Sequence, residues 1–131
     1  MEAAAPKGRV LIVDDQFLIV EFLRIWTEAC GFEVCDTAKT AEQAVARALE
    51  HRPDIVLMDV QLDKGGDGVA AAAEIVAAIS ARIIFVTASN DAKTLARIAA
   101  QKPFATLIKP VDPAELGQVL EQAMSAPAKG C

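Results

Sequence analysis

Short apolar runs along the chain are separated by longer amphipathic stretches. The runs predict strands at about residues 9–13, 32–35, 55–58, 83–86 and 104–108. In the run Ile55-Val56-Leu57-Met58 every position is apolar, which is typical of a strand buried on both faces of a parallel sheet. The stretches between the runs predict helices over about 16–30, 40–51, 68–79, 91–101 and 112–125. This alternation predicts an α/β fold, a three-layer α/β/α sandwich around a five-stranded parallel sheet with right-handed crossovers.

Local signals mark the ends of several of these helices. Thr40-Ala41-Glu42-Gln43 has the form of a capping box, and Asp112-Pro113 offers an N-cap followed by proline at the first helical position. Gly31 suits the end of the first helix. Residues 61–67, between the third run and the third helix, predict a loop.

The first predicted helix carries more apolar residues than one buried face needs. Only Glu21, Arg24 and Glu28 form a polar stripe along it. Two interpretations follow: either a neighbouring helix covers the outer apolar side, or that side is a docking patch, including Phe17 or Val20, beside the carboxyl ends of the strands.

Length and composition point to one domain. The 131 residues suffice for a single core, with a domain expected over 9–125 and flexible segments over 1–8 and 126–131. The apolar runs are too short to span a bilayer and no secretion signal is visible, so we expect a cytoplasmic protein without membrane insertion. Three cysteines without CxxC spacing fit reduced thiols. A net charge of -5 without a basic cluster argues against nucleic-acid binding.

Polar side chains follow four of the predicted strands where each strand ends. Asp14 and Asp15 follow the first, Asp59 the third, Thr87 the fourth and Lys109 the fifth. Each alone fits a helix cap or a turn. In parallel sheets, however, the carboxyl ends of the strands form one rim where ligands bind. Three carboxylates crowded there repel one another unless a cation relieves them, so the set predicts a divalent-metal site.

With these residues in place, the chain resembles, over nearly its whole length, the receiver domain of bacterial two-component response regulators. The resemblance is carried by Asp14-Asp15, Asp59, Thr87 and Lys109-Pro110. It implies the flavodoxin-like, CheY-like strand order 2-1-3-4-5. It also implies a single-domain response regulator, a phosphoacceptor switch that relays a signal by protein contact and is not an enzyme beyond self-phosphorylation and self-dephosphorylation.

The same resemblance implies a role for each residue at the rim. Asp59 would be the phosphoacceptor, while Thr87 would hydrogen bond the phosphoryl group and Lys109 would pair with it. Asp15, Asp59 and the backbone carbonyl of Gln61 would bind Mg²⁺, or Mn²⁺ in its place, directly, and Asp14 mainly through water. The bond between Lys109 and Pro110 would be cis.

The implied partner is a histidine kinase or a histidine phosphotransfer protein that donates the phosphoryl group from phosphohistidine. No GxxxxGK[ST] or kinase-type glycine loop is present, so direct use of ATP is not expected. Thr106 stands where many receivers have a switching aromatic residue, and the segment 88–101, which contains helix four, is expected to carry the response instead. Pro103-Phe104-Ala105-Thr106 resembles part of the FATGUY motif of single-domain regulators that often work with HWE-type kinases, although Leu107-Ile108 replace its Gly-Tyr.

A departure from the family and several alternatives stay open at this stage. Asp63 stands where receivers commonly have proline, in a loop one residue longer than usual. A haloacid-dehalogenase-like phosphatase or phosphotransferase would share the Asp, Thr and Lys, but it needs a second acid where Gln61 stands. A nucleotide- or flavin-binding module would need a GxGxxG after the first strand. A degenerate receiver and a phosphate sink without its own output are the remaining alternatives.

Overall fold

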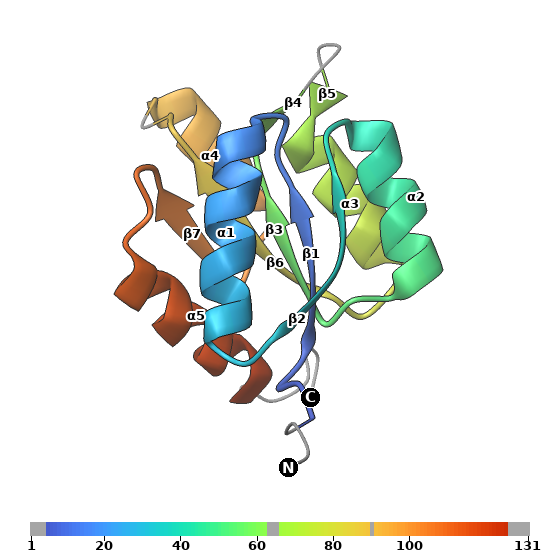
Figure 1. The fold of residues 1–131 in the computed structure, drawn as a ribbon. Coiled ribbons are helices and arrows are strands. Elements are labelled where there is room, and N and C mark those ends of the chain that lie inside the picture. The colour runs from blue at the N-terminus through green and yellow to red at the C-terminus, as the bar shows by residue number, and fades with distance from the viewer. Residues whose placement is uncertain (1–4, 63–65, 90, 126–131) are drawn as a thin grey trace.

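The computed structural model describes residues 5–62, 66–89 and 91–125. Strands β1 (Arg9–Val13), β2 (Glu33–Ala38), β3 (Ile55–Met58), β6 (Arg82–Thr87) and β7 (Ala105–Ile108) form one sheet in the order β2-β1-β3-β6-β7 (Figure 1). Each neighbouring pair is parallel. Counted along the sheet alone this is the order 2-1-3-4-5, so the predicted three-layer architecture is confirmed.

Helices cover both faces of the sheet. They are α1 (Phe17–Ala29), α2 (Ala41–His51), α3 (Gly68–Ala78), α4 (Ala92–Ala100) and α5 (Pro113–Ser125). Alternate residues of a strand point to opposite faces. Val10 and Ile12 accordingly join a core with Leu23 of α1 and Leu116 of α5, on the side where Figure 1 shows α1 in front of the sheet. The intervening residues of β1 pack with α2, α3 and α4 on the other side.

The helix signals behave as the sequence predicts. The Thr40 side chain caps α2 by accepting a hydrogen bond from the Gln43 N–H at 3.0 Å. The Gln43 side chain returns to the N–H of Lys39 at 3.1 Å, one residue before the cap. Gly31 follows the end of α1 with φ +94°, in the left-handed region that glycine adopts without strain.

Two local predictions were wrong. Strand β2 extends to Ala38 instead of ending at Cys35, because its polar second half is held by pairing with β1. That pairing shifts register, so that Val10 and Leu11 of β1 pair with Val34 and Asp36 and skip Cys35. Residues 61–67, predicted as a loop, contain the two-residue strands β4 (Gln61–Leu62) and β5 (Gly66–Asp67), which pair antiparallel.

The segments predicted to be flexible at the two ends of the chain are described only in part. Residues 1–4 and 126–131 of the segments predicted to be flexible lie outside the described residues. Within the described part, the Lys7 N–H donates to the Gly31 carbonyl and the Gly8 carbonyl accepts from the Glu33 N–H, each at 2.9 Å. The domain boundary at Arg9 stays a prediction. Among the helices that the structure describes, none combines the length and the apolar character needed to cross a bilayer.

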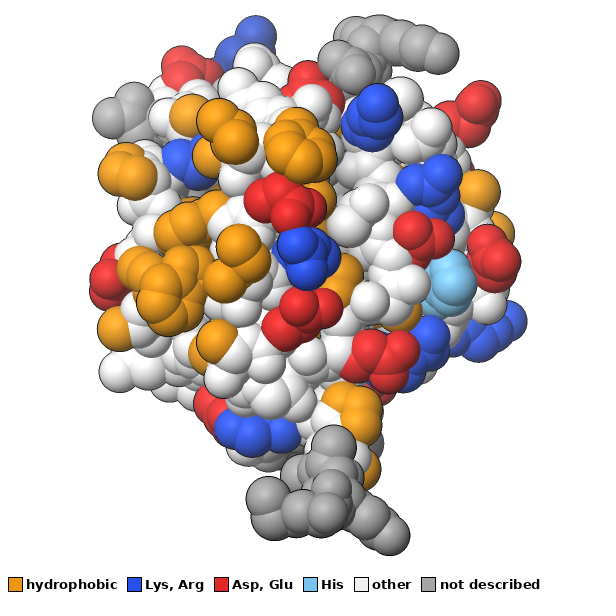
Figure 2. Space-filling view, viewed as in Figure 1, with side chains coloured by type: hydrophobic (Ala, Val, Ile, Leu, Met, Phe, Trp, Pro, Cys, Tyr) orange, Lys and Arg blue, Asp and Glu red, His pale blue; other side chains and the backbone are white. Residues whose placement is uncertain are grey.

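The outer side of α1 stays exposed. Phe17 and Leu18 are 73% and 78% exposed, and Ile25 and Trp26 are also exposed, whereas Val20 packs partly against the core. Figure 2 shows hydrophobic side chains gathered on this face of the molecule over α1, beside a column of acidic and basic ones. Among the described residues, none covers this outer side of α1, which is therefore an exposed apolar surface.

Candidate functional site

Main-chain hydrogen bonds fix the residues that follow the strands. The Asp14 N–H donates to the Ala38 carbonyl at 3.0 Å, and the Asp59 N–H donates to the Val13 carbonyl at 2.9 Å. The Lys109 N–H donates to the carbonyl of Thr87, also at 2.9 Å. These bonds continue the parallel ladders beyond the ends of β1, β3 and β7. The backbones that carry the candidate side chains are therefore as well positioned as the sheet itself.

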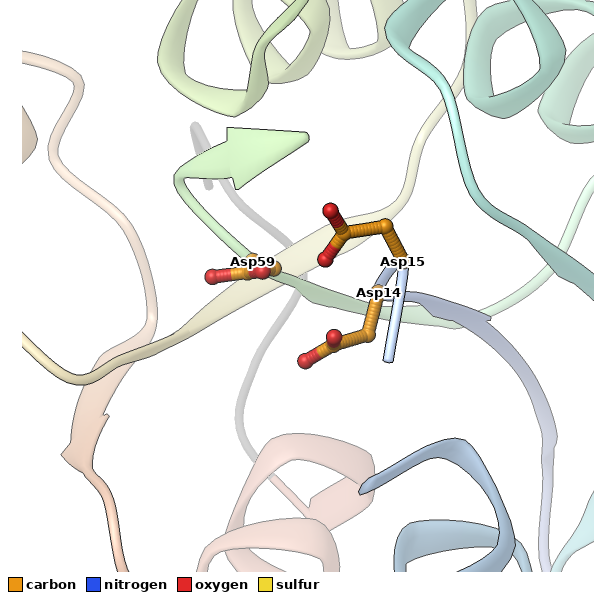
Figure 3. Close-up of side chains that lie close together, drawn as sticks. All are labelled: Asp14, Asp15 and Asp59. Carbon is orange, nitrogen blue, oxygen red and sulfur yellow. The ribbon is translucent and has the colours of Figure 1, made fainter. Parts of the chain in front are cut away.

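Three of the predicted residues meet at this rim. Carboxylate oxygens of Asp14, Asp15 and Asp59 all lie within 4.8 Å of one another. Figure 3 shows Asp14 and Asp15 at the end of β1 beside Asp59 at the end of β3, with their carboxylates on the same side. Burial, and next to it the charge of Asp14, raises the pKa of Asp59 to about 6. The Asp59 carboxylate is thus held in a place where its negative charge is disfavoured.

Lys109 joins two of these carboxylates. Its Nζ lies 2.8 Å from Asp14 Oδ2 and 3.7 Å from Asp59 Oδ1, with 13% of the Lys109 side chain exposed. The other oxygen of Asp14, Oδ1, accepts from the Gln16 N–H at 2.9 Å. Both carboxylate oxygens of Asp14 therefore already have partners. A change in the Lys109 side-chain rotamer would bring its ammonium group from Asp14 to Asp59.

Thr87 lies on the strand beside Asp59. It ends β6, which pairs with β3 in a register that sets Phe85 opposite Met58, the residue before Asp59. Thr87 is buried, and its Oγ1 accepts from the Ser89 N–H at 3.1 Å. A threonine hydroxyl that accepts one hydrogen bond still has its own proton to donate. Thr87 can therefore act as a donor at the rim while its oxygen is held in place.

Two features of the segment after Asp59 were not predicted from the sequence. The N–H of Gly68 donates to the Val60 carbonyl at 2.7 Å, and this hydrogen bond joins the start of α3 to the residue that follows Asp59. A Cβ atom at Gly68 would lie 1.8 Å from the Asp59 carbonyl oxygen, so only glycine fits at the start of α3. Gln61 lies opposite Asp67 in the β4–β5 hairpin, which fixes its backbone a short distance along the chain from Asp59.

The residues at the rim fit a hard divalent cation. Mg²⁺ prefers carboxylate and carbonyl oxygens, and the acidic cluster offers three carboxylates from two adjacent strands. A bound cation would also offset the burial and the repulsion that raise the pKa of Asp59. The site therefore has the donor set and the electrostatic need for such an ion.

Comparison with known proteins gives a consistent result. The family described as "Response regulator receiver domain" matches residues 10–121. The transcriptional regulatory protein PdtaR of Mycobacterium tuberculosis is 35% identical over 124 residues, which are 95% of this chain and 60% of that protein. The chain spans about half the length of other curated relatives.

Two solved structures are similar in fold and sequence. The signal receiver domain of a modulated diguanylate cyclase from Desulfovibrio desulfuricans G20 has a TM-score of 0.84 and 39% identity, covering 89% of this chain and 93% of that one. CheY in the CheX–CheY–BeF3–Mg²⁺ complex from Borrelia burgdorferi has a TM-score of 0.80 and 28% identity, covering 90% of each chain. Together with the rim geometry, these matches show that the chain belongs to the response regulator receiver domain family.

Proposed function

We propose that Asp59 accepts a phosphoryl group from a phosphohistidine on a histidine kinase or a histidine phosphotransfer protein. The observation that carries this proposal is the position of Asp59 at the end of the central strand, within the three-carboxylate cluster and 3.7 Å from the Lys109 ammonium. Burial, and next to it the charge of Asp14, raises the pKa of Asp59 to about 6, which fits an acceptor that needs a cation beside it.

The transfer is a displacement at phosphorus. A carboxylate oxygen of Asp59 attacks in line, the bond from phosphorus to the donor histidine nitrogen breaks, and the histidine leaves with its electron pair. Lys109 leaves Asp14 to pair with the transferred phosphoryl oxygens, and the Thr87 hydroxyl donates a hydrogen bond to one of them. The chain supplies positive charge and a donor where negative charge accumulates.

Asp15, Asp59 and the backbone carbonyl of Gln61 would hold Mg²⁺ directly, with Asp14 contributing through water because its own oxygens are engaged. When bound, the cation supplies charge neutralisation for the phosphoryl oxygens, and Mn²⁺ would serve in the same role. The presence of Mg²⁺ in the CheX–CheY–BeF3–Mg²⁺ complex from Borrelia burgdorferi, which is similar in fold, supports this assignment.

The phosphorylated domain would then relay its state by protein contact in the cytoplasm. Helix α1 offers the apolar surface for the phosphodonor, because Phe17 and Leu18 are exposed in the turn next to Asp15. The chemistry of the domain itself would be limited to taking a phosphoryl group from small donors and losing that group to water. The partial FATGUY motif, Pro103-Phe104-Ala105-Thr106, supports a kinase of the HWE type.

Labelling with acetyl phosphate tests the proposal. Incubated with acetyl phosphate and Mg²⁺, the parent should gain the mass of one phosphoryl group, and Asp59→Asn should gain none while staying folded. Asp91→Asn is the matched control, because asparagine preserves the cap of α4 and this variant should be labelled like the parent. Labelling of Asp59→Asn at the parent's rate would overturn the assignment, and so would labelling that is undiminished after Mg²⁺ is removed.

A further inference from the structure

Arg97 of α4 forms an ion pair with Asp67, the last residue of β5. Asp67 is also the N-cap of α3, where its Oδ1 accepts from the Val69 N–H at 3.0 Å. Burial alone would raise the pKa of Asp67, but the Arg97 guanidinium and the Val69 N–H hold it below its ordinary value. One carboxylate thus ties three elements together: α3, the β4–β5 hairpin and α4.

The hairpin that Asp67 belongs to carries a residue of the site. Asp67 lies opposite Gln61, the residue whose backbone carbonyl is assigned to Mg²⁺. A two-stranded hairpin is marginal on its own, and these strands have two residues each. On the β4 side, burial of Leu62 anchors the hairpin. On the β5 side, it is anchored by the Gly68–Val60 hydrogen bond and by the contacts of the Asp67 carboxylate.

Helix α4 is itself lightly anchored. Among its residues only Ile98 is buried, with Leu95 partly buried beside it. Arg97 directly precedes Ile98 and contacts Asp67, 30 residues earlier in the chain. The ion pair of Arg97 with Asp67 therefore links the position of α4 to the closure of the hairpin, beside the core that Leu62 and Ile98 share.

We propose that Arg97 is a positioning residue for the metal site: through Asp67 it favours the closed hairpin in which Gln61 is held beside Asp59. The inference rests on the proposed function, because it concerns the cation assigned there. Binding affinity falls in proportion to the fraction of molecules in the competent form, so opening the hairpin weakens cation binding. By reciprocity, a cation that closes the hairpin also restrains α4 through Arg97.

The sign of the effect separates positioning from simple electrostatics. Removing a positive charge near an acidic rim should strengthen the binding of a cation. Removing the Arg97–Asp67 ion pair, which holds the hairpin that carries Gln61, should instead weaken cation binding. Lys93 is an exposed cation on the same helix, so Lys93→Gln measures the electrostatic part alone.

Isothermal titration of Mg²⁺ into the full chain tests the proposal. Arg97→Gln should bind Mg²⁺ about two- to five-fold more weakly than the parent, the range expected for an exposed ion pair. Lys93→Gln should bind equally or slightly more tightly, and Arg97→Lys should recover part of the loss. Asp67→Asn keeps the α3 cap. In the Asp67→Asn background, Arg97→Gln should therefore bring no further loss.

Amide exchange of the peptide that contains Gln61 and Leu62 gives a second readout, which should speed up in Arg97→Gln and not in Lys93→Gln. If Arg97→Gln matches Lys93→Gln in both measurements, the positioning role is overturned while the proposed function stands. A parent that binds no Mg²⁺ would overturn the assigned metal site and this inference together.

Discussion

The first residue of α3, Gly68, lies against the backbone of Asp59. A Cβ atom at Gly68 would come within 1.8 Å of the Asp59 carbonyl oxygen and 3.0 Å of the Val60 Cα. The atoms in the way are main chain, which cannot rotate aside as a side chain can. The absence of a side chain at Gly68 therefore allows the backbone position that Asp59 has at the end of β3.

Gly68→Ala should consequently lower the free energy of unfolding by about 3 kcal/mol or more, at the upper end for an overpacked site. It should also slow labelling of Asp59 by acetyl phosphate, since relief of the clash moves the acceptor. Urea unfolding and intact mass measure the two effects. The control is Gly117→Ala in α5, whose Cβ would meet only the Cys30 side chain, at 3.2 Å, and whose effect should stay within about 1 kcal/mol. Equal effects at both glycines would contradict the argument.

The raised pKa of Asp59 predicts a pH dependence in Mg²⁺-free buffer. The pKa rises from 3.8 to about 6, so between these values the folded state binds more protons than the unfolded state. The free energy of unfolding should therefore fall as pH rises from about 4 to about 6, and stay lower above that. Asp59→Asn removes the charge and should be more stable than the parent at pH 7.5, by up to about 3 kcal/mol.

Chemical denaturation of both proteins at pH 4.5 and pH 7.5 checks this prediction. The advantage of Asp59→Asn should shrink at the lower pH, and saturating Mg²⁺ should reduce it at pH 7.5. An unchanged difference across the pH range would show that the carboxylate is not disfavoured by its surroundings.

The exposed apolar side of α1 predicts where the phosphodonor binds. Leu18→Glu places a charge on a side chain that is 78% exposed, so the fold should be unaffected. Transfer from the phosphohistidine of a cognate partner should slow at least ten-fold, while labelling by acetyl phosphate stays the same. Leu49→Glu, at an exposed apolar residue of α2, is the control and should change neither rate. Slowing of both reactions by Leu18→Glu would indicate damage to the site instead.

Helix α4 is expected to report the phosphorylated state. Thr106 of β7 is smaller than the aromatic residue of many receivers and cannot fill the room left by a movement of Thr87. Amide hydrogen exchange over Ala92–Ala100 should therefore slow most when beryllofluoride and Mg²⁺ are added, because this helix has a single buried residue to hold it. Unchanged exchange there at full occupancy of Asp59 would disprove the prediction.

A buried hydroxyl in α1 predicts that one substitution will raise the free energy of unfolding. Thr27 is fully buried, and its Oγ1 has no hydrogen-bond partner among the described residues. Thr27→Val keeps the shape, removes the unpaired group and should raise the free energy of unfolding by about 1 kcal/mol. Thr27→Ser keeps the hydroxyl, loses a methyl group and should be destabilised. Thermal unfolding of the two variants decides the matter, and a loss of stability in Thr27→Val would mean that the hydroxyl is paired.

The architecture and the acidic rim could be predicted from the sequence because both depend on local signals. Buried parallel strands are apolar throughout, and the polar residue that ends each run stands out, as Asp59 does after Met58. The second half of β2 lacks such a signal: Asp36 and Thr37 are extended because β1 lies beside them, not because of their own preferences.

Contacts between distant segments could not be predicted from the sequence, because they leave no local signal in it. Nothing in the spacing of Asp67 and Arg97 predicts an ion pair across 30 residues. Lys109 was expected to pair with a phosphoryl group, and its contact with Asp14 depends on how two strands lie in the folded sheet. The close approach of Gly68 to Asp59 could have been suspected only from a glycine at the first position of a helix, which is a weak signal.

The outer strands of the sheet affect how molecules of this protein behave toward one another. Strand β7 has four residues and is flanked by Pro103 and Pro110, which have no N–H to donate. At the other edge, β2 begins at Glu33 and carries Asp36 in its middle. Short length, proline and charge at edge strands oppose the addition of a strand from another chain. A domain that exposes Phe17 and Leu18 can therefore remain dispersed at high concentration, because neither edge strand of its sheet favours pairing with a strand of another molecule.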